Sequence, residues 1–176
     1  MSFLSQLRDY ASGLSHLCLS GLQVAPALDR SLPSPQSIQM DRTFTVEEAN
    51  RTLPLVSRIV DDLVRSHHNW EDKVREFELA TVGSSPDRPD AMAELLQLET
   101  QRLAVEIEGY ISELSDLGVV CKGLDTGLVD FLGERDGKRV YYCWMLGERQ
   151  IEYWHEIDAG FVGRQKIEAM TLTESR

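Results

Sequence analysis

The strongest pattern along the chain is a repeat of mostly apolar positions that begins just after Pro54. Its steps alternate between four and three residues, which is typical of a helix that packs lengthwise on another helix. The repeat consists of Val56, Val60, Leu63, His67, Trp70, Val74 and Phe77. Residues 45–48 read Thr-Val-Glu-Glu and predict a capping box. We expect residues 50–54 to interrupt a first short helix and Pro54 to begin a longer one that ends near Val82.

A second repeat with the same spacing predicts a second helix, capped by Asp90 at its start and by Gly118 at its end. The repeat consists of Met92, Leu96, Leu103, Ile107, Tyr110, Leu114 and Leu117. The connecting turn, residues 83–89, is short, so the two helices should form an antiparallel hairpin over residues 45–118. Such a hairpin buries only one face of each helix. We therefore expect the C-terminal part or a second copy to cover the rest, and predict a homo-oligomer formed through the hairpin.

From residue 127 the pattern changes to strands, which we expect at 128–132, 139–146 and 151–157 in a β-hairpin region over 127–158. A turn centred between Glu148 and Arg149 puts one set of side chains on one face: Val140, Tyr142, Trp144, Tyr153 and His155. The other face then carries Tyr141, Cys143, Met145, Glu152, Trp154 and Glu156. A slip of one residue would exchange the faces of one strand. The predicted fold class is α+β, a long antiparallel helical hairpin followed by a small antiparallel sheet.

Residues 1–39 differ in kind from the rest, because they contain eight serines and only four charged side chains. Dense patterning begins just after Met40. We expect residues 1–39 to be a disordered extension, or Met40 to be the natural start. Residues 40–176 should then form a single α+β domain with a C-terminal tail at about 165–176.

Charge and cysteine content narrow the functional classes. The chain has 18 Lys and Arg against 29 Asp and Glu, a net charge of −11, which argues against nonspecific nucleic-acid binding. No apolar run is long enough for a membrane span. The three cysteines are far apart and form no Cys-x-x-Cys motif, so neither a disulfide framework nor a zinc ribbon is predicted. We expect a cytoplasmic protein with no membrane or nucleic-acid partner.

Chemistry-bearing residues concentrate between residues 130 and 164, where aromatic side chains alternate with titratable ones. Aromatic walls with embedded polar groups are typical of small-ligand pockets. The candidate pocket residues are Asp130, Tyr142, Trp144, Glu148, Tyr153, His155, Asp158 and Arg164.

Three of these residues, Asp130, Glu148 and His155, are candidate ligands for one transition metal ion. Glu156 or Cys143 are further candidate donors, although no diagnostic metal-binding spacing is present. Without a metal, His155 beside Asp130 or Asp158 could perform acid–base chemistry, and Arg164 could hold an anionic substrate. Cys143 on a strand is more simply explained as a buried core residue than as a nucleophile.

His67 is the other histidine that we single out, because it occupies a position in the first apolar repeat. It should be at least half buried and close to Glu99, Arg102 and Glu106, any of which could pair with it. The simplest interpretation is a polar residue that fixes the alignment of the helices.

Several segments together resemble a family of small bacterial proteins, domain of unknown function 2203. They are Phe44-Thr45-Val46-Glu47-Glu48-Ala49-Asn50, Leu53-Pro54, Gly127-Leu128-Val129-Asp130-Phe131, Tyr142-Cys143-Trp144-Met145-Leu146-Gly147-Glu148 and Tyr153-Trp154-His155-Glu156-Ile157-Asp158-Ala159-Gly160-Phe161. The resemblance covers about residues 43–167 and leaves out residues 1–39, in agreement with an extension there. The family name implies no activity, cofactor or site residue.

Three functional classes therefore stay open. The favoured one is a binding or interaction module, with a dimerising hairpin and an aromatic-lined C-terminal site for a small ligand or a protein partner. The second is a metal-binding protein or metal-dependent enzyme centred on His155. The third is a metal-free acid–base enzyme, so the sequence does not decide whether the protein is an enzyme.

Overall fold

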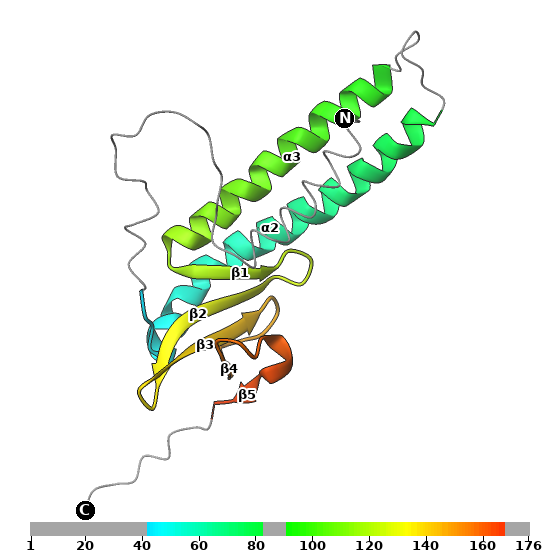
Figure 1. The fold of residues 1–176 in the computed structure, drawn as a ribbon. Helices are drawn as coiled ribbons and strands as arrows, with labels where there is room; N and C mark the ends of the chain where they lie inside the picture. The colour runs from blue at the N-terminus through cyan, green and yellow to red at the C-terminus, as the bar shows by residue number, and fades with distance from the viewer. Residues whose placement is uncertain (1–41, 83–90, 168–176) are drawn as a thin grey trace, which may run out of the picture.

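The computed structural model describes residues 42–82 and 91–167 (Figure 1). These residues form two helices followed by a five-stranded antiparallel sheet, which confirms the predicted α+β class. The sheet lies at the end of the hairpin where the first helix begins and the second ends, and the other end of the hairpin projects beyond it (Figure 1). The predictions for residues 1–39, the turn at 83–89, the Asp90 cap and the tail from 168 onward lie outside the described residues.

The first helix, α2, is a single element of 36 residues, Val46–Thr81, and the predicted interruption at residues 50–54 is wrong. Thr45 and Glu48 form the capping box as predicted. Pro54 lies inside the helix, where it cannot donate to the carbonyl of Asn50 and costs roughly 3 kcal/mol. The helix continues because its apolar face is buried on both sides of Pro54, at Leu53 and Val56 among others.

The second helix, α3, spans Ala91–Asp116, and Gly118 follows it with a φ of 80°, the left-handed conformation predicted for a C-cap glycine. Its buried stripe differs from the predicted one at the start, where Ala93 is buried and Met92 is 57% exposed. Neither helix, within the parts of the chain that the structure describes, is long and apolar enough to cross a membrane.

The alignment of the two helices is marked by a hydrogen bond between the Ser66 hydroxyl and Glu106, at 2.9 Å. Glu106 also accepts from Arg102, and within the described residues no hydrogen bond or ion pair joins His67 to any of its three predicted partners, Glu99, Arg102 and Glu106. His67 is half buried as predicted, and its ring stacks on that of Trp70. Burial lowers the pKa of His67, and its Nδ1 atom has no hydrogen-bond partner among the described residues.

The five strands pair in chain order to form one antiparallel sheet. They are β1 (Val119–Gly123), β2 (Leu128–Arg135), β3 (Lys138–Met145), β4 (Tyr153–Glu156) and β5 (Gln165–Lys166). The central three correspond to the predicted strands. The edge strands β1 and β5 were not predicted: β5 has only two residues, and β1 follows Gly118 directly after the second helix.

The predicted register between β3 and β4 is wrong by one residue. Tyr141 pairs with His155 and Cys143 pairs with Tyr153, whereas the assumed turn would have paired Tyr142 with His155. Since opposed residues in an antiparallel pair share a face, the slip moves His155 and Tyr153 to the face of Tyr141 and Cys143. The opposite face carries Tyr142 and Trp144, together with other buried apolar side chains of the core: Val129, Phe131 and Val140.

Contacts of Phe44, Asn50 and Gly127 attach the sheet to the hairpin. The Phe44 ring packs edge-on against that of Phe131, and the Phe44 N–H donates to the Leu132 carbonyl at 2.7 Å. The Asn50 side chain accepts a hydrogen bond from the Ile151 N–H at 2.9 Å. Gly127, in the turn before β2, approaches α2 so closely that a Cβ atom there would lie 2.7 Å from Val60 Cγ1.

We predict that Gly127→Ala destabilises the protein more than Gly137→Ala does. Both glycines have a positive φ, 65° and 74°, so both substitutions incur the same left-handed strain. Only at residue 127 would the added methyl group also overlap Val60 and Leu146, at a further cost of about 1–3 kcal/mol. Urea unfolding of the two variants measures the difference, and equal free energies of unfolding would contradict the described packing.

Candidate functional site

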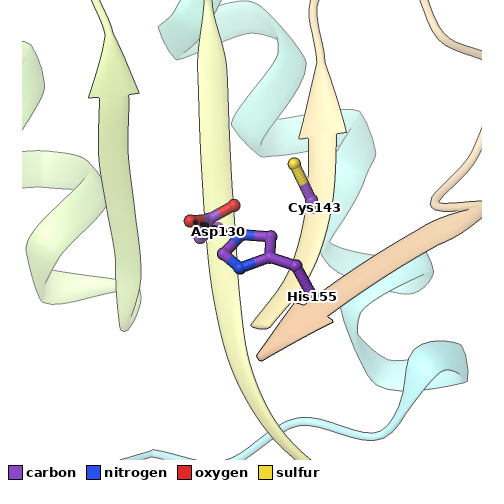
Figure 2. Close-up of side chains that lie close together, drawn as sticks. All are labelled: Asp130, Cys143 and His155. Carbon is purple, nitrogen blue, oxygen red and sulfur yellow. Dashed lines mark hydrogen bonds and ion pairs between the residues drawn. The ribbon is translucent and has the colours of Figure 1, made fainter. Parts of the chain in front are cut away.

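The sheet brings together three side chains with different metal-binding or proton-transferring groups: Asp130 of β2, Cys143 of β3 and His155 of β4 (Figure 2). Asp130 and Cys143 are paired directly opposite each other on β2 and β3. His155 is paired with Tyr141, which lies on the same face of β3 as Cys143, so all three side chains share one face of the sheet. One ligand atom of each residue lies within 4.8 Å of the other two. The exposed fractions are 1%, 0% and 2%, so the cluster is enclosed by protein.

The His155 ring is held at both nitrogens. Nδ1 lies 2.8 Å from the carbonyl oxygen of Glu156, which can only accept, so Nδ1 carries a hydrogen and donates it. Nε2 lies 3.2 Å from Asp130 Oδ2. Because β3 separates β2 from β4 in the sheet, the imidazole reaches across β3 and past Cys143 to make this contact.

The charges around the ring favour its protonated form. The hydrogen bond that His155 donates to Asp130 raises the pKa of His155 above its ordinary value of 6.5, against the lowering effects of burial and of Lys122 on β1. The contact with Asp130 therefore stabilises the imidazolium form of His155 when no metal is present. Burial, reinforced by the negative charge of Asp130, raises the pKa of the Cys143 thiol, so the sulfur is protonated in the same state.

One atom of the cluster is left without a partner. Asp130 Oδ1 is buried and accepts no hydrogen bond within the described residues. A buried carboxylate oxygen with no donor is costly and calls for a specific explanation.

Glu148 and Arg164, two of the predicted site residues, pair with each other beside the cluster. An Nη atom of Arg164 lies 2.9 Å from Glu148 Oε1, and Glu148 Oε2 accepts from the Met145 N–H. The Arg164 guanidinium also lies over the rings of Tyr153 and Phe161. Of the three predicted metal ligands, the structure thus brings Asp130 and His155 together and engages Glu148 elsewhere.

The remaining candidates lie apart from the cluster. Tyr142 and Trp144 are buried on the opposite face, where the Tyr142 hydroxyl donates to the Glu134 carbonyl and the Trp144 indole donates to the Glu148 carbonyl. The side chains of Asp158 and Glu156 are exposed. The aromatic residues of the predicted pocket are therefore divided between the two faces of the sheet.

Cys143, named from the sequence only as a further candidate donor beside Glu156, is the third member of the cluster. The signal that identifies it is its register position opposite Asp130, which depends on the turn between β2 and β3. The Asp136-Gly137 pair in that turn is typical of tight hairpin turns, and centring the pairing on it places Asp130 opposite Cys143.

Comparison with known proteins identifies one family. The model of the family described as "Uncharacterized conserved protein (DUF2203)" matches residues 42–167, so the chain belongs to this family. No curated protein and no solved structure matches the chain.

We predict that Asp130→Asn lowers the pKa of His155 in the metal-free protein, because an amide cannot stabilise the imidazolium as a carboxylate does. In the wild type the pKa of His155 is raised on folding. The contact between protonated His155 and Asp130 therefore contributes its full free energy to folding below about pH 6.5. This stabilisation is lost as the pH rises through the raised pKa of His155.

NMR titration of the His155 ring in the presence of a chelator measures this shift, and urea unfolding over the same pH range measures its effect on stability. The exposed His68 ring serves as an internal reference. An unchanged His155 pKa in Asp130→Asn would contradict the described hydrogen bond.

Proposed function

We propose that this member of the DUF2203 family is a metal-binding protein that holds one zinc-like transition metal ion between Asp130, Cys143 and His155. The observation that carries the proposal is the convergence of a carboxylate, a thiol and an imidazole, from three different strands, within 4.8 Å of one another in a buried site. A metal ion there would link β2, β3 and β4.

The orientation of His155 supports the proposal. Metal-binding histidines commonly donate their other ring N–H to a backbone carbonyl or a carboxylate, which fixes the tautomer and aims the free nitrogen at the metal. His155 donates from Nδ1 to the Glu156 carbonyl, so Nε2 faces Asp130 and Cys143. Loss of the Nε2 proton would leave that nitrogen ready to bind a cation.

The two other donors differ in what a cation would change. Asp130 Oδ1 is a buried acceptor with no partner among the described residues, and a metal ion would satisfy it. The Cys143 thiol is protonated because of its burial, and metal binding would displace that proton.

The donor set indicates the kind of metal. Thiolate and imidazole ligands favour zinc and similar borderline ions over magnesium and calcium, which prefer oxygen ligands. Three protein ligands leave one position of a tetrahedron for water or another ligand. Because the three side chains are at most 2% exposed, we infer a role in which the ion is retained within the sheet rather than one based on turnover of a large substrate.

The Asp130–His155 contact also supports a second candidate, a metal-free proton-sharing pair that is structural or takes part in acid–base chemistry. The aromatic-lined ligand site has less support, because Tyr142 and Trp144 face the core and not His155. The metal experiment below separates these alternatives.

We predict that the full chain, expressed without a histidine tag and purified under reducing conditions, binds about one equivalent of zinc or cobalt. Cys143→Ala and His155→Ala should each lower the bound metal severalfold, because each removes one of three ligands. Cobalt loading of the wild type should produce a thiolate-to-cobalt charge-transfer band that Cys143→Ser abolishes. Elemental analysis and absorption spectroscopy are the measurements.

Cys121→Ala is the matched control, because Cys121 is also a buried strand cysteine but pairs with Val129 on the face opposite Asp130. It should keep its metal. Absence of metal from reconstituted wild type, or retention of full metal binding by folded Cys143→Ala and His155→Ala, would overturn the proposal. A metal-free protein in which Asp130→Asn still shifts the pKa of His155 would favour the proton-sharing pair.

A further inference from the structure

The helix α3 has a second regular stripe on the side opposite its buried face. The steps between its positions alternate between four and three residues along the whole helix, as in a coiled-coil seam. The outer stripe, as we call it, consists of Ala91, Leu95, Leu98, Arg102, Val105, Gly109, Ser112 and Asp116. From it we infer that α3 packs antiparallel against α3 of a second copy of the chain, an interaction independent of the metal site.

The large apolar members of the outer stripe face solvent in the single chain. Leu95, Leu98 and Val105 are 61%, 63% and 65% exposed. A helix that packs on one neighbour needs only one apolar stripe, and its outer face is ordinarily polar. On α2, the turns around the exposed Leu79 carry charged side chains at the corresponding helical positions, Arg75 and Asp72. Of the two helices that the structure describes, only α3 therefore has the pattern of a helix packed on two sides.

The outer stripe itself carries little charge, although the chain is acidic and Glu94 and Glu113 lie beside the stripe. A net charge of −11 makes two copies repel each other, and the repulsion is weakest where the contacting residues carry few acidic groups. The outer stripe has no acidic residue from Ala91 to Ser112. Its single charge over that length is Arg102, which is paired with Glu106 at 3.0 Å in its own helix.

The sizes of the stripe residues complement one another about a twofold axis. An antiparallel pair of α3 helices centred near Arg102 sets Leu95 opposite Gly109 and Leu98 opposite Val105, and each contact occurs twice. Glycine weakens a helix interior, so a reason for its presence is needed. A Cβ atom built on Gly109 has no neighbour within 4 Å, so this open position can receive the side chain of Leu95 from the partner.

The position of the sheet favours the antiparallel orientation. The sheet lies at the end of α3, which leads directly into β1. The start of α3 lies at the other, projecting end of the hairpin (Figure 1). A parallel pair would bring the two sheets to the same end and set Gly109 opposite Gly109. An antiparallel pair sets the sheets at opposite ends of a four-helix arm.

Light scattering of the full chain tests the proposal. We expect the wild type to have twice the 19.9 kDa chain mass, and the double variant Leu98→Glu/Val105→Glu to have the mass of one chain. The double variant Leu55→Glu/Leu79→Glu adds the same charge at exposed leucines of α2, outside the stripe, and should stay dimeric. Circular dichroism confirms that each variant is folded.

Cysteine cross-linking tests the orientation. In a Cys18→Ser background, a mixture of Leu95→Cys chains and Gly109→Cys chains should form mixed disulfide-linked dimers. Leu95→Cys chains alone should form far fewer disulfide-linked dimers, since the two introduced cysteines lie at opposite ends of the contact between the α3 helices. A monomeric wild type at all concentrations, a dimer that survives Leu98→Glu/Val105→Glu, or cross-linking of Leu95→Cys to itself would overturn the proposal.

Discussion

The pairing of Tyr141 with His155 is the constraint on which the candidate site depends. Successive side chains on a strand point to opposite faces, so this pairing decides which residues His155 can meet. With Tyr141 opposite it, the imidazole shares a face with Cys143 and Asp130. One residue of slip would instead move it to the face of Tyr142 and Trp144, which forms part of the apolar core. The chemistry of the site thus follows from a backbone alignment.

The fold places the buried donor cluster and the exposed outer stripe of α3 in different parts of the molecule. The beginning of α2 holds the sheet through Phe44, Asn50 and the close approach of Gly127, and the sheet in turn encloses the donor cluster. The helix α3, which carries the outer stripe, extends along the hairpin and into its projecting end (Figure 1). Metal binding and self-association are therefore proposed for different parts of the molecule, and each can be removed by substitution without touching residues of the other.

Much of the fold could be predicted from the sequence, because helices leave long periodic signals. The capping box at Thr45, the end of α2 near Val82 and the glycine cap at Gly118 each depend on local chemistry and were predicted correctly. Pro54 was misinterpreted, because burial of the flanking apolar residues outweighs its local cost. The site could be predicted only in part: the Asp136-Gly137 turn places Asp130 opposite Cys143, but His155 joins them through a β3–β4 register that the sequence alone left open.

X-ray absorption spectroscopy of the zinc-loaded full chain is the most direct test of the central claim, because it reports the ligand atoms themselves. The account predicts one sulfur ligand at about 2.3 Å and nitrogen or oxygen ligands at about 2.0–2.2 Å, since Cys143 contributes the thiolate and His155 and Asp130 the other donors. A shell of nitrogen and oxygen ligands with no sulfur would contradict it, as it would place the ion away from Cys143.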